Sequence, residues 1–223
     1  MPRMHFTDNS TNHSAKSAVE KDSGSLHKNR AERYTAEDRR LMLDLARRVV
    51  QAGVSGETFN KPVISDTHLA LNSPAASFVT LKLNNQLRGC IGNLEANSSL
   101  IDSVLRNSYL AAFKDHRFEP VRADELDGLS YEISILTPAE PLLVSSEAEL
   151  LKKLRPNVDG LIFEARGRKA TFLPAVWEQL KEPELFLNHL RQKAGLASDY
   201  WSDDVKCFVY QAIKISEKDN DQS

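Results

Sequence analysis

The sequence predicts an α+β fold in one composite domain. Three patterns support this: an apolar helical period after Thr35, an alternating hairpin over residues 77–92, and a second alternating hairpin around Gly167. The 223 residues, 41% of them hydrophobic, can bury one substantial core. Lys and Arg (29) nearly balance Asp and Glu (31), so no global field draws the chain towards nucleic acid.

The ends of the chain differ in composition from the middle. Residues 1–33 are rich in Ser, Asn, Lys and His and lack an apolar period, so we expect a disordered tail there, a domain over 34–216 and a flexible C-terminus over 217–223. No signal peptide is visible, and no apolar run approaches the roughly 20 residues that span a bilayer. Cys90 and Cys207 lack the spacing of a zinc site. We therefore expect a cytoplasmic protein without a metal site, a membrane partner or a nucleic-acid partner.

The first predicted element is a helix that begins after Thr35. The letters TAED form a capping box, and Leu41, Leu45 and Val49 lie on one helical stripe. Gly53 is the predicted end of this helix.

The next segment, SFVTLKLNNQLRGCIG, reads as two strands of a hairpin. A two-residue loop would place Leu81 opposite Arg88 and mix the two faces. A three-residue loop, Asn84 to Gln86, instead pairs Lys82 with Arg88, and we prefer it. The predicted core face then consists of Val79, Leu81, Leu83, Leu87 and Ile91.

This register gathers polar groups on the opposite face: Thr80, Lys82, Arg88 and Cys90. Two cations directly opposite each other repel unless an anion lies between them. Glu132, in the strand YEISIL, and Asp115, at the end of the helix before it, are the candidate protein carboxylates. A ligand is the other source of such an anion.

The cysteine has two interpretations. Arg88 lies roughly 7 Å along the strand from Cys90 and would stabilise a thiolate, while Gly89 and Gly92 would admit a substrate and leave amide groups free for an oxyanion. Alternatively, the cysteine is a buried core residue and the glycines only permit a bulge and a sharp exit. The letters GCIG also fit the G-x-x-G loop of RNA-binding KH domains, but here they end a strand, which argues against that reading.

The C-terminal half supports the same fold class. DGLIFEARGRKATFLP predicts a hairpin that turns at Gly167, and Pro174 suits the first position of the following helix. PELFLNHLRQKAGL predicts a further helix that ends at Gly195. VKCFVYQAI predicts one closing strand, with Cys207 in the core.

Several blocks together resemble the AMMECR domain family, from about Thr35 to Ile215. L-R-G-C-I-G falls on Leu87–Gly92, D-x-R-F-x-P on Asp115–Pro120 and L-P-x-V on Leu173–Val176. The sequence is most similar to the bacterial branch called protein A of the AmmeMemoRadiSam system. The resemblance implies an antiparallel sheet flanked by helices, with a smaller subdomain.

The resemblance also implies partners: a Memo-like protein, similar to non-haem iron dioxygenases, and a radical S-adenosylmethionine enzyme. One hypothesis is an interaction component whose contact residues are Lys82, Leu87, Gly89, Ile91, Gly92 and Arg117. The alternative is an enzyme for a small anionic substrate, with Cys90 as nucleophile or redox centre and Arg88 and Lys82 as anion anchors. In that enzyme Glu132 or Asp115 would orient Arg88. The sequence favours the first, because no general base can be placed and no cofactor motif is present.

Overall fold

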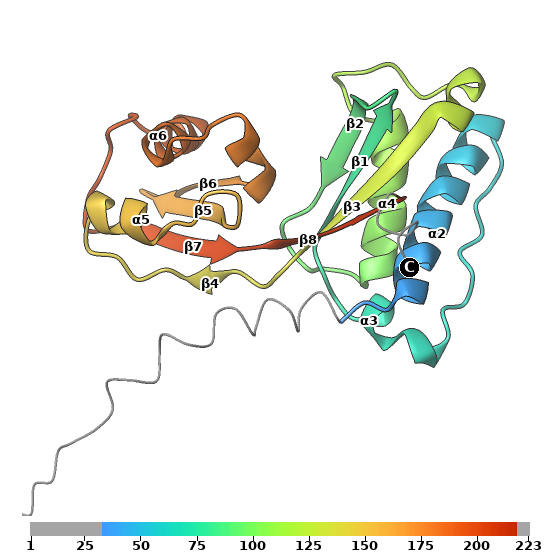
Figure 1. Ribbon diagram of the computed structural model, residues 1–223, viewed down its shortest axis with the longest axis horizontal. Coiled ribbons are helices and arrows are strands. Elements are labelled where there is room, and N and C mark those ends of the chain that lie inside the picture. The colour runs from blue at the N-terminus through green and yellow to red at the C-terminus, as the bar shows by residue number, and fades with distance from the viewer. Residues whose placement is uncertain (1–32, 218–223) are drawn as a thin grey trace, which may run out of the picture. The chain divides into compact units, whose positions relative to one another are not determined.

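The computed structural model describes residues 33–217 and contains two four-stranded antiparallel sheets with helices packed on them (Figure 1). The large sheet has the strand order β2-β1-β3-β8, and the small sheet has the order β4-β7-β5-β6. The α+β prediction is confirmed. The predictions for the N-terminal tail and the C-terminus fall outside the described residues, apart from positions 33 and 217.

The elements divide between the two sheets. Those of the large sheet and its helices are α2 (Ala36–Ser55), η1 (Asp66–His68), α3 (Leu69–Asn72), β1 (Ser77–Leu83), β2 (Gln86–Gly92), α4 (Leu100–Phe113), η2 (Ala123–Gly128), β3 (Leu129–Leu136) and β8 (Ala212–Ser216). Those of the small sheet and its helices are β4 (Glu140–Pro141), α5 (Glu147–Lys153), β5 (Gly160–Ala165), β6 (Arg168–Phe172), η3 (Pro174–Glu178), α6 (Pro183–Lys193) and β7 (Lys206–Tyr210).

Helix α2 begins as predicted but ends later. The Thr35 hydroxyl accepts the Asp38 N–H and the Asp38 carboxylate accepts the Thr35 N–H, which completes the capping box. The helix ends at Ser55 and is capped by Gly56, whose φ of 68° is left-handed, so the predicted end at Gly53 is wrong. Gly53 lies inside the helix, at a position where a Cβ would collide with the Phe113 ring of α4.

The larger core lies between the large sheet and the helices α2 and α4. These two helices pack against each other and cover one face of the sheet (Figure 1). Val79 and Leu81 of β1 and Tyr131 and Ile133 of β3 point into this core and are 0–2% exposed. Burial raises the pKa of Tyr131 to about 12.

The smaller core lies between the small sheet and its helices. The Trp177 ring stacks on Phe186 of α6 at 3.8 Å between centroids, and its indole N–H donates to the carbonyl of Asp159. Cys207 is 4% exposed, which confirms its predicted place in a core, and burial raises its pKa to about 12.

The predicted closing strand is two strands in different sheets. The chain leaves β7 at Tyr210 and enters β8 at Ala212, and Gln211 between them exchanges hydrogen bonds with Thr137. The single-strand prediction is therefore wrong. A small apolar cluster draws members from both sheets: Ala76, Leu136, Ile162 and Tyr210.

No helix within residues 33–217 has the length and apolar character needed to cross a bilayer.

Candidate functional site

The β1–β2 hairpin closes with a two-residue turn. Asn84 and Asn85 have φ values of 50° and 63°, and Leu83 pairs directly with Gln86. Two successive left-handed residues are typical of the type I′ turn, in which Asn is favoured. The predicted three-residue loop is wrong.

A bulge in β2 follows the turn. Lys82 pairs with Leu87, while Leu81 pairs with Gly89, so Arg88 is the extra residue between them. The predicted pairing of Lys82 with Arg88 does not exist. The bulge adds one unpaired residue to β2, as the predicted three-residue loop would have added one to the turn. The strand pairing beyond Arg88 is therefore as predicted.

Beyond the bulge, polar side chains form a row on the sheet face opposite α2 and α4. Thr80 pairs with Cys90 on one side and with Glu132 on the other, and its hydroxyl donates to the Cys90 sulfur at 3.3 Å. The Lys82 ammonium lies 3.1 Å from a Glu132 oxygen. The structure therefore brings together Thr80, Lys82, Cys90 and Glu132, and the cation among them has a carboxylate partner.

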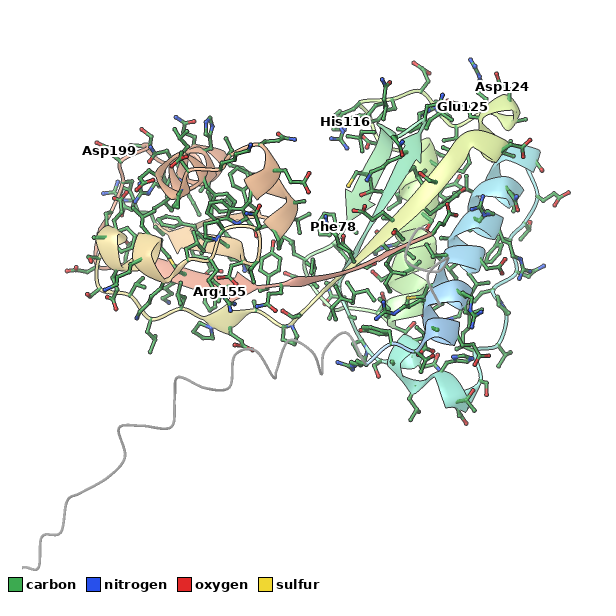
Figure 2. The ribbon with its side chains drawn as sticks, viewed as in Figure 1. Phe78, His116, Asp124, Glu125, Arg155 and Asp199 are labelled. Carbon is green, nitrogen blue, oxygen red and sulfur yellow. The ribbon has the colours of Figure 1, made fainter. Side chains whose placement is uncertain are left out.

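Arg88 makes its contacts away from this row. Its Nε and Nη2 donate to the two oxygens of Glu125 at 2.7 and 2.9 Å, and Nη2 also donates to the carbonyl of Pro120. Neither Glu132 nor Asp115, the two predicted partners, orients this guanidinium. Glu125 lies in η2, in the segment that joins α4 to β3 (Figure 2). The Arg88 side chain is 13% exposed, and its buried Nη1 has no hydrogen-bond partner among residues 33–217.

Asp115 and Arg117 bind the backbone of Cys90. The Cys90 N–H donates to Asp115 Oδ2 at 2.9 Å, and Arg117 Nη2 donates to the Cys90 carbonyl at 3.2 Å. Arg117 also binds Asp115 through Nε and Nη2. β2 is an edge strand, so this Asp115–Arg117 pair satisfies backbone groups that a missing neighbour would otherwise bind. The Cys90 amide is consequently not free to hold an oxyanion, contrary to the sequence-based hypothesis.

These pairs fix the protonation states around the segment. The hydrogen bonds from Arg117 hold the pKa of Asp115 well below its usual range, against the opposing effect of burial, and the Cys90 N–H adds to this. The Arg88 guanidinium lowers the pKa of Glu125 in the same way. Asp115 raises the pKa of Arg117, and the charge of an ionised Cys90 makes a smaller contribution in the same direction. The carboxylates are therefore ionised at neutral pH.

Both glycines of the segment are required by close packing. A Cβ at Gly89 would collide with the carbonyl oxygen of Ala111 in α4. A Cβ at Gly92 would collide with the ring of Phe78, its cross-strand partner. The glycines thus let β2 approach a helix and an aromatic ring, which accounts for them without a substrate.

Apolar side chains differ sharply in exposure along this segment. Ile91 packs against the larger core as predicted. The predicted core position of Leu87 is wrong: the bulge pairs it with Lys82, and it is 45% exposed. Leu94, just beyond the strand, is 41% exposed. Among the predicted contact residues, Leu87 is the apolar one that solvent reaches most.

A hollow of about 400 Å³ lies beside Arg88. It is lined by Arg88, Arg117, Phe118, Glu119, Pro120, Arg122 and Glu125. Each of its three arginines already has a carboxylate partner. Arg88 pairs with Glu125, Arg117 with Asp115 and Arg122 with Asp124. Over residues 33–217, no three His, Cys, Asp or Glu side chains gather as a metal ion would require.

The fold and the site define a class: α+β domains with two antiparallel sheets, in which an edge hairpin carries a glycine-flanked cysteine held by an Asp–Arg pair. Residues 43–215 match the AMMECR1 family model, and the chain belongs to this family.

Relatives known by sequence or by crystal structure match most of this chain. A protein of Methanothermobacter thermautotrophicus is 35% identical over 175 residues, which cover 78% of this chain and 91% of that protein. MJ0810 of Methanocaldococcus jannaschii is 36% identical over 182 residues, covering 80% and 89% of the two chains. The crystal structure of the uncharacterized protein PH0010 from Pyrococcus horikoshii matches with a TM-score of 0.71 at 31% identity, over 82% of this chain and 92% of that chain.

Proposed function

We propose that this protein is an interaction component of the AmmeMemoRadiSam protein A type. It binds a Memo-like protein, and with it a radical S-adenosylmethionine enzyme, through the Leu87–Gly92 segment. The observation that carries the proposal is a solvent-exposed leucine, Leu87 at 45% exposure, beside cations that are already neutralised.

The charge pairing argues against a small anionic substrate here. Lys82 lies 3.1 Å from Glu132 and Arg88 lies 2.7 Å from Glu125. An incoming carboxylate or phosphate would have to displace these carboxylates, because each would repel it. Charge-assisted bonds of this kind are the stronger ones in proteins, so displacement is unfavourable.

The edge of β2 restricts how a partner can dock. A partner strand would need the N–H and C=O of Cys90, and both are bound by Asp115 and Arg117. The partner therefore contacts side chains, and Leu87 and Leu94 supply the apolar area for this contact.

Co-purification with the Memo-like partner tests the proposal. We expect Leu87→Asp to weaken binding by at least about tenfold, because a charge would be buried against the partner. Leu143→Asp is the matched control, since Leu143 is 81% exposed in the segment after β4. We expect this control and Cys90→Ser to bind as the unmodified chain does. A folded Leu87→Asp variant that binds at full strength would refute the proposal.

The catalytic alternative rests on two contacts of Cys90. Its sulfur accepts a hydrogen bond from the Thr80 hydroxyl, and its carbonyl accepts one from the Arg117 guanidinium, which places a cation beside this residue. In this alternative Cys90 is the nucleophile or redox centre of an enzyme for a small anionic substrate, with Arg117 in the role first given to Arg88. The reactivity of the native thiol separates the two functions.

A further inference from the structure

A second hollow lies on the small sheet, at the turn between β5 and β6. Its volume is about 470 Å³. Four cations and two carboxylates line it, so it carries a surplus of positive charge in a chain whose net charge is -2. The lining residues are Glu164, Ala165, Arg166, Gly167, Arg168, Lys169, Asp204 and Lys206.

The turn holds an arginine in an unfavourable backbone conformation. Ala165 pairs with Arg168, so Arg166 and Gly167 form a two-residue turn, with φ values of 51° and 70°. Asn or Gly normally occupies the first of these positions, because a left-handed conformation is strained for larger side chains. Asn84 fills the equivalent position in the β1–β2 turn. An arginine here is therefore unexplained by the turn itself, and such a residue directs attention to function.

Neighbouring groups fix this arginine in place. The Arg166 N–H donates to Asp204 at 2.7 Å, and the Tyr200 hydroxyl donates to the other Asp204 oxygen at 2.9 Å. The Arg166 guanidinium lies over the Tyr200 ring, 5.0 Å from its centroid. In the part of the chain that the structure describes, this guanidinium has no hydrogen-bond acceptor, so its donors remain available.

The lysines supply the rest of the surplus charge. Glu164 lies between Lys169 and Lys206 across three strands. Lys169 binds this carboxylate at 2.7 Å, while Lys206 is exposed and forms no ion pair within residues 33–217. Glu164 therefore pairs with Lys169 alone, and the charge of Lys206 is left without an ion-pair partner among the described residues.

We propose that this β5–β6 turn site binds the phosphate group of a small phosphorylated molecule. Four cations against two carboxylates leave a surplus of two positive charges, which matches a dianionic phosphate. Arg166 offers planar hydrogen-bond donors to this phosphate, and Lys206 offers a point charge. The site is open at its tip, where a Cβ at Gly167 would meet nothing within 4 Å. This site is separate from the Leu87–Gly92 segment, so neither proposal depends on the other.

Titration of the full chain with inorganic pyrophosphate, followed by calorimetry, tests the proposal. We expect saturable binding that Arg166→Asn and Lys206→Gln each weaken by about tenfold, the effect of losing one charge-assisted contact. Arg166→Asn also relieves the strained turn, so its melting temperature should equal or exceed that of the unmodified chain. Loss of binding without loss of stability separates a functional arginine from a structural one.

Lys152→Gln and Lys181→Gln are the charge-matched controls, because both lysines are exposed and lie outside the hollow. The proposal is overturned if pyrophosphate shows no saturable binding, or if the controls weaken it as much as the site variants do. Citrate that binds as tightly as pyrophosphate would overturn the assignment to phosphate.

Discussion

At the scale of single residues, Gly89 determines how closely β2 approaches α4. A Cβ at this position would overlap the Ala111 carbonyl oxygen, which is helix backbone and cannot rotate away. We expect Gly89→Ala to lower the free energy of unfolding by about 1–3 kcal/mol, measured by urea denaturation. Gln86→Ala, at an exposed position of the same strand, should change it by less than about 0.5 kcal/mol. Equal effects of the two variants would show that β2 and α4 do not meet as described.

The two cysteines should differ in reactivity. Cys207 is 4% exposed with a pKa raised to about 12 by burial, whereas Cys90 is only partly buried. In the native chain we expect an aromatic disulfide reagent to titrate Cys90 alone, with Cys207 reacting after denaturant is added. Cys90→Ser and Cys207→Ala assign the two phases. If Cys90 also stays silent until the protein unfolds, the catalytic alternative is lost and the docking proposal stands.

At the scale of elements, the Asp115–Arg117 pair protects the edge of β2, and this protection depends on pH. The pKa of Asp115 is lower in the folded chain than its usual value of 3.8, so the unfolded chain binds more protons in acid. The stabilisation is complete above this usual value and is lost as the pH falls towards the folded pKa. Removing the charge with Asp115→Asn should lower the free energy of unfolding by about 1.5–3 kcal/mol at pH 7.

Melting temperatures of the two chains between pH 7 and pH 2 provide the measurement. Because Asp38, Asp102 and Glu125 also have lowered pKa values, the unmodified chain loses stability in acid for several reasons. The difference in melting temperature between the unmodified chain and Asp115→Asn reports the effect of Asp115 alone, and it should narrow as the pH falls. Parallel curves would mean that the Asp115 carboxylate does not stabilise the fold.

The hairpin shows what an alternating pattern can predict. Alternation correctly paired Thr80 with Cys90, because only that register puts Val79, Leu81 and Ile91 on one face. It could not identify the turn, since a three-residue loop and a two-residue turn with a bulge shift the register equally. The bulge at Arg88 is therefore absent from the prediction, and the Lys82–Arg88 pair was an artefact of this ambiguity.

The partner of Arg88 was missed for a different reason. Glu125 lies 37 residues further along the chain, in a 3-10 segment without strand or helix periodicity. No local pattern relates such a residue to a strand. Asp115 was a candidate because it follows α4, and it does reach β2, but it binds the Cys90 backbone instead of the guanidinium.

At the scale of the whole molecule, the closing segment of the described chain supplies one strand to each sheet: β7 to the small sheet and β8 to the large sheet. The apolar run of the closing segment reads as one strand, and only the positions of its neighbours, β3 and β5, reveal that β8 and β7 belong to different sheets. Those neighbours are distant in sequence, so a single sequence did not show the division. The described residues from Tyr34 to position 217 nevertheless belong to one compact unit.

This single unit predicts cooperative unfolding, and the chain contains two natural reporters. Trp177 and Trp201 both belong to the core of the small sheet, whereas most α-helical residues lie in α2 and α4, which have 20 and 14 residues. Ile133→Ala removes a fully buried side chain from the larger core and should cost about 2–5 kcal/mol. We expect the urea midpoints from tryptophan fluorescence and from far-UV circular dichroism to fall together. A fluorescence midpoint that stays in place while the dichroism midpoint falls would show that the two cores unfold independently, because in that case the substitution in one core would not reach the other.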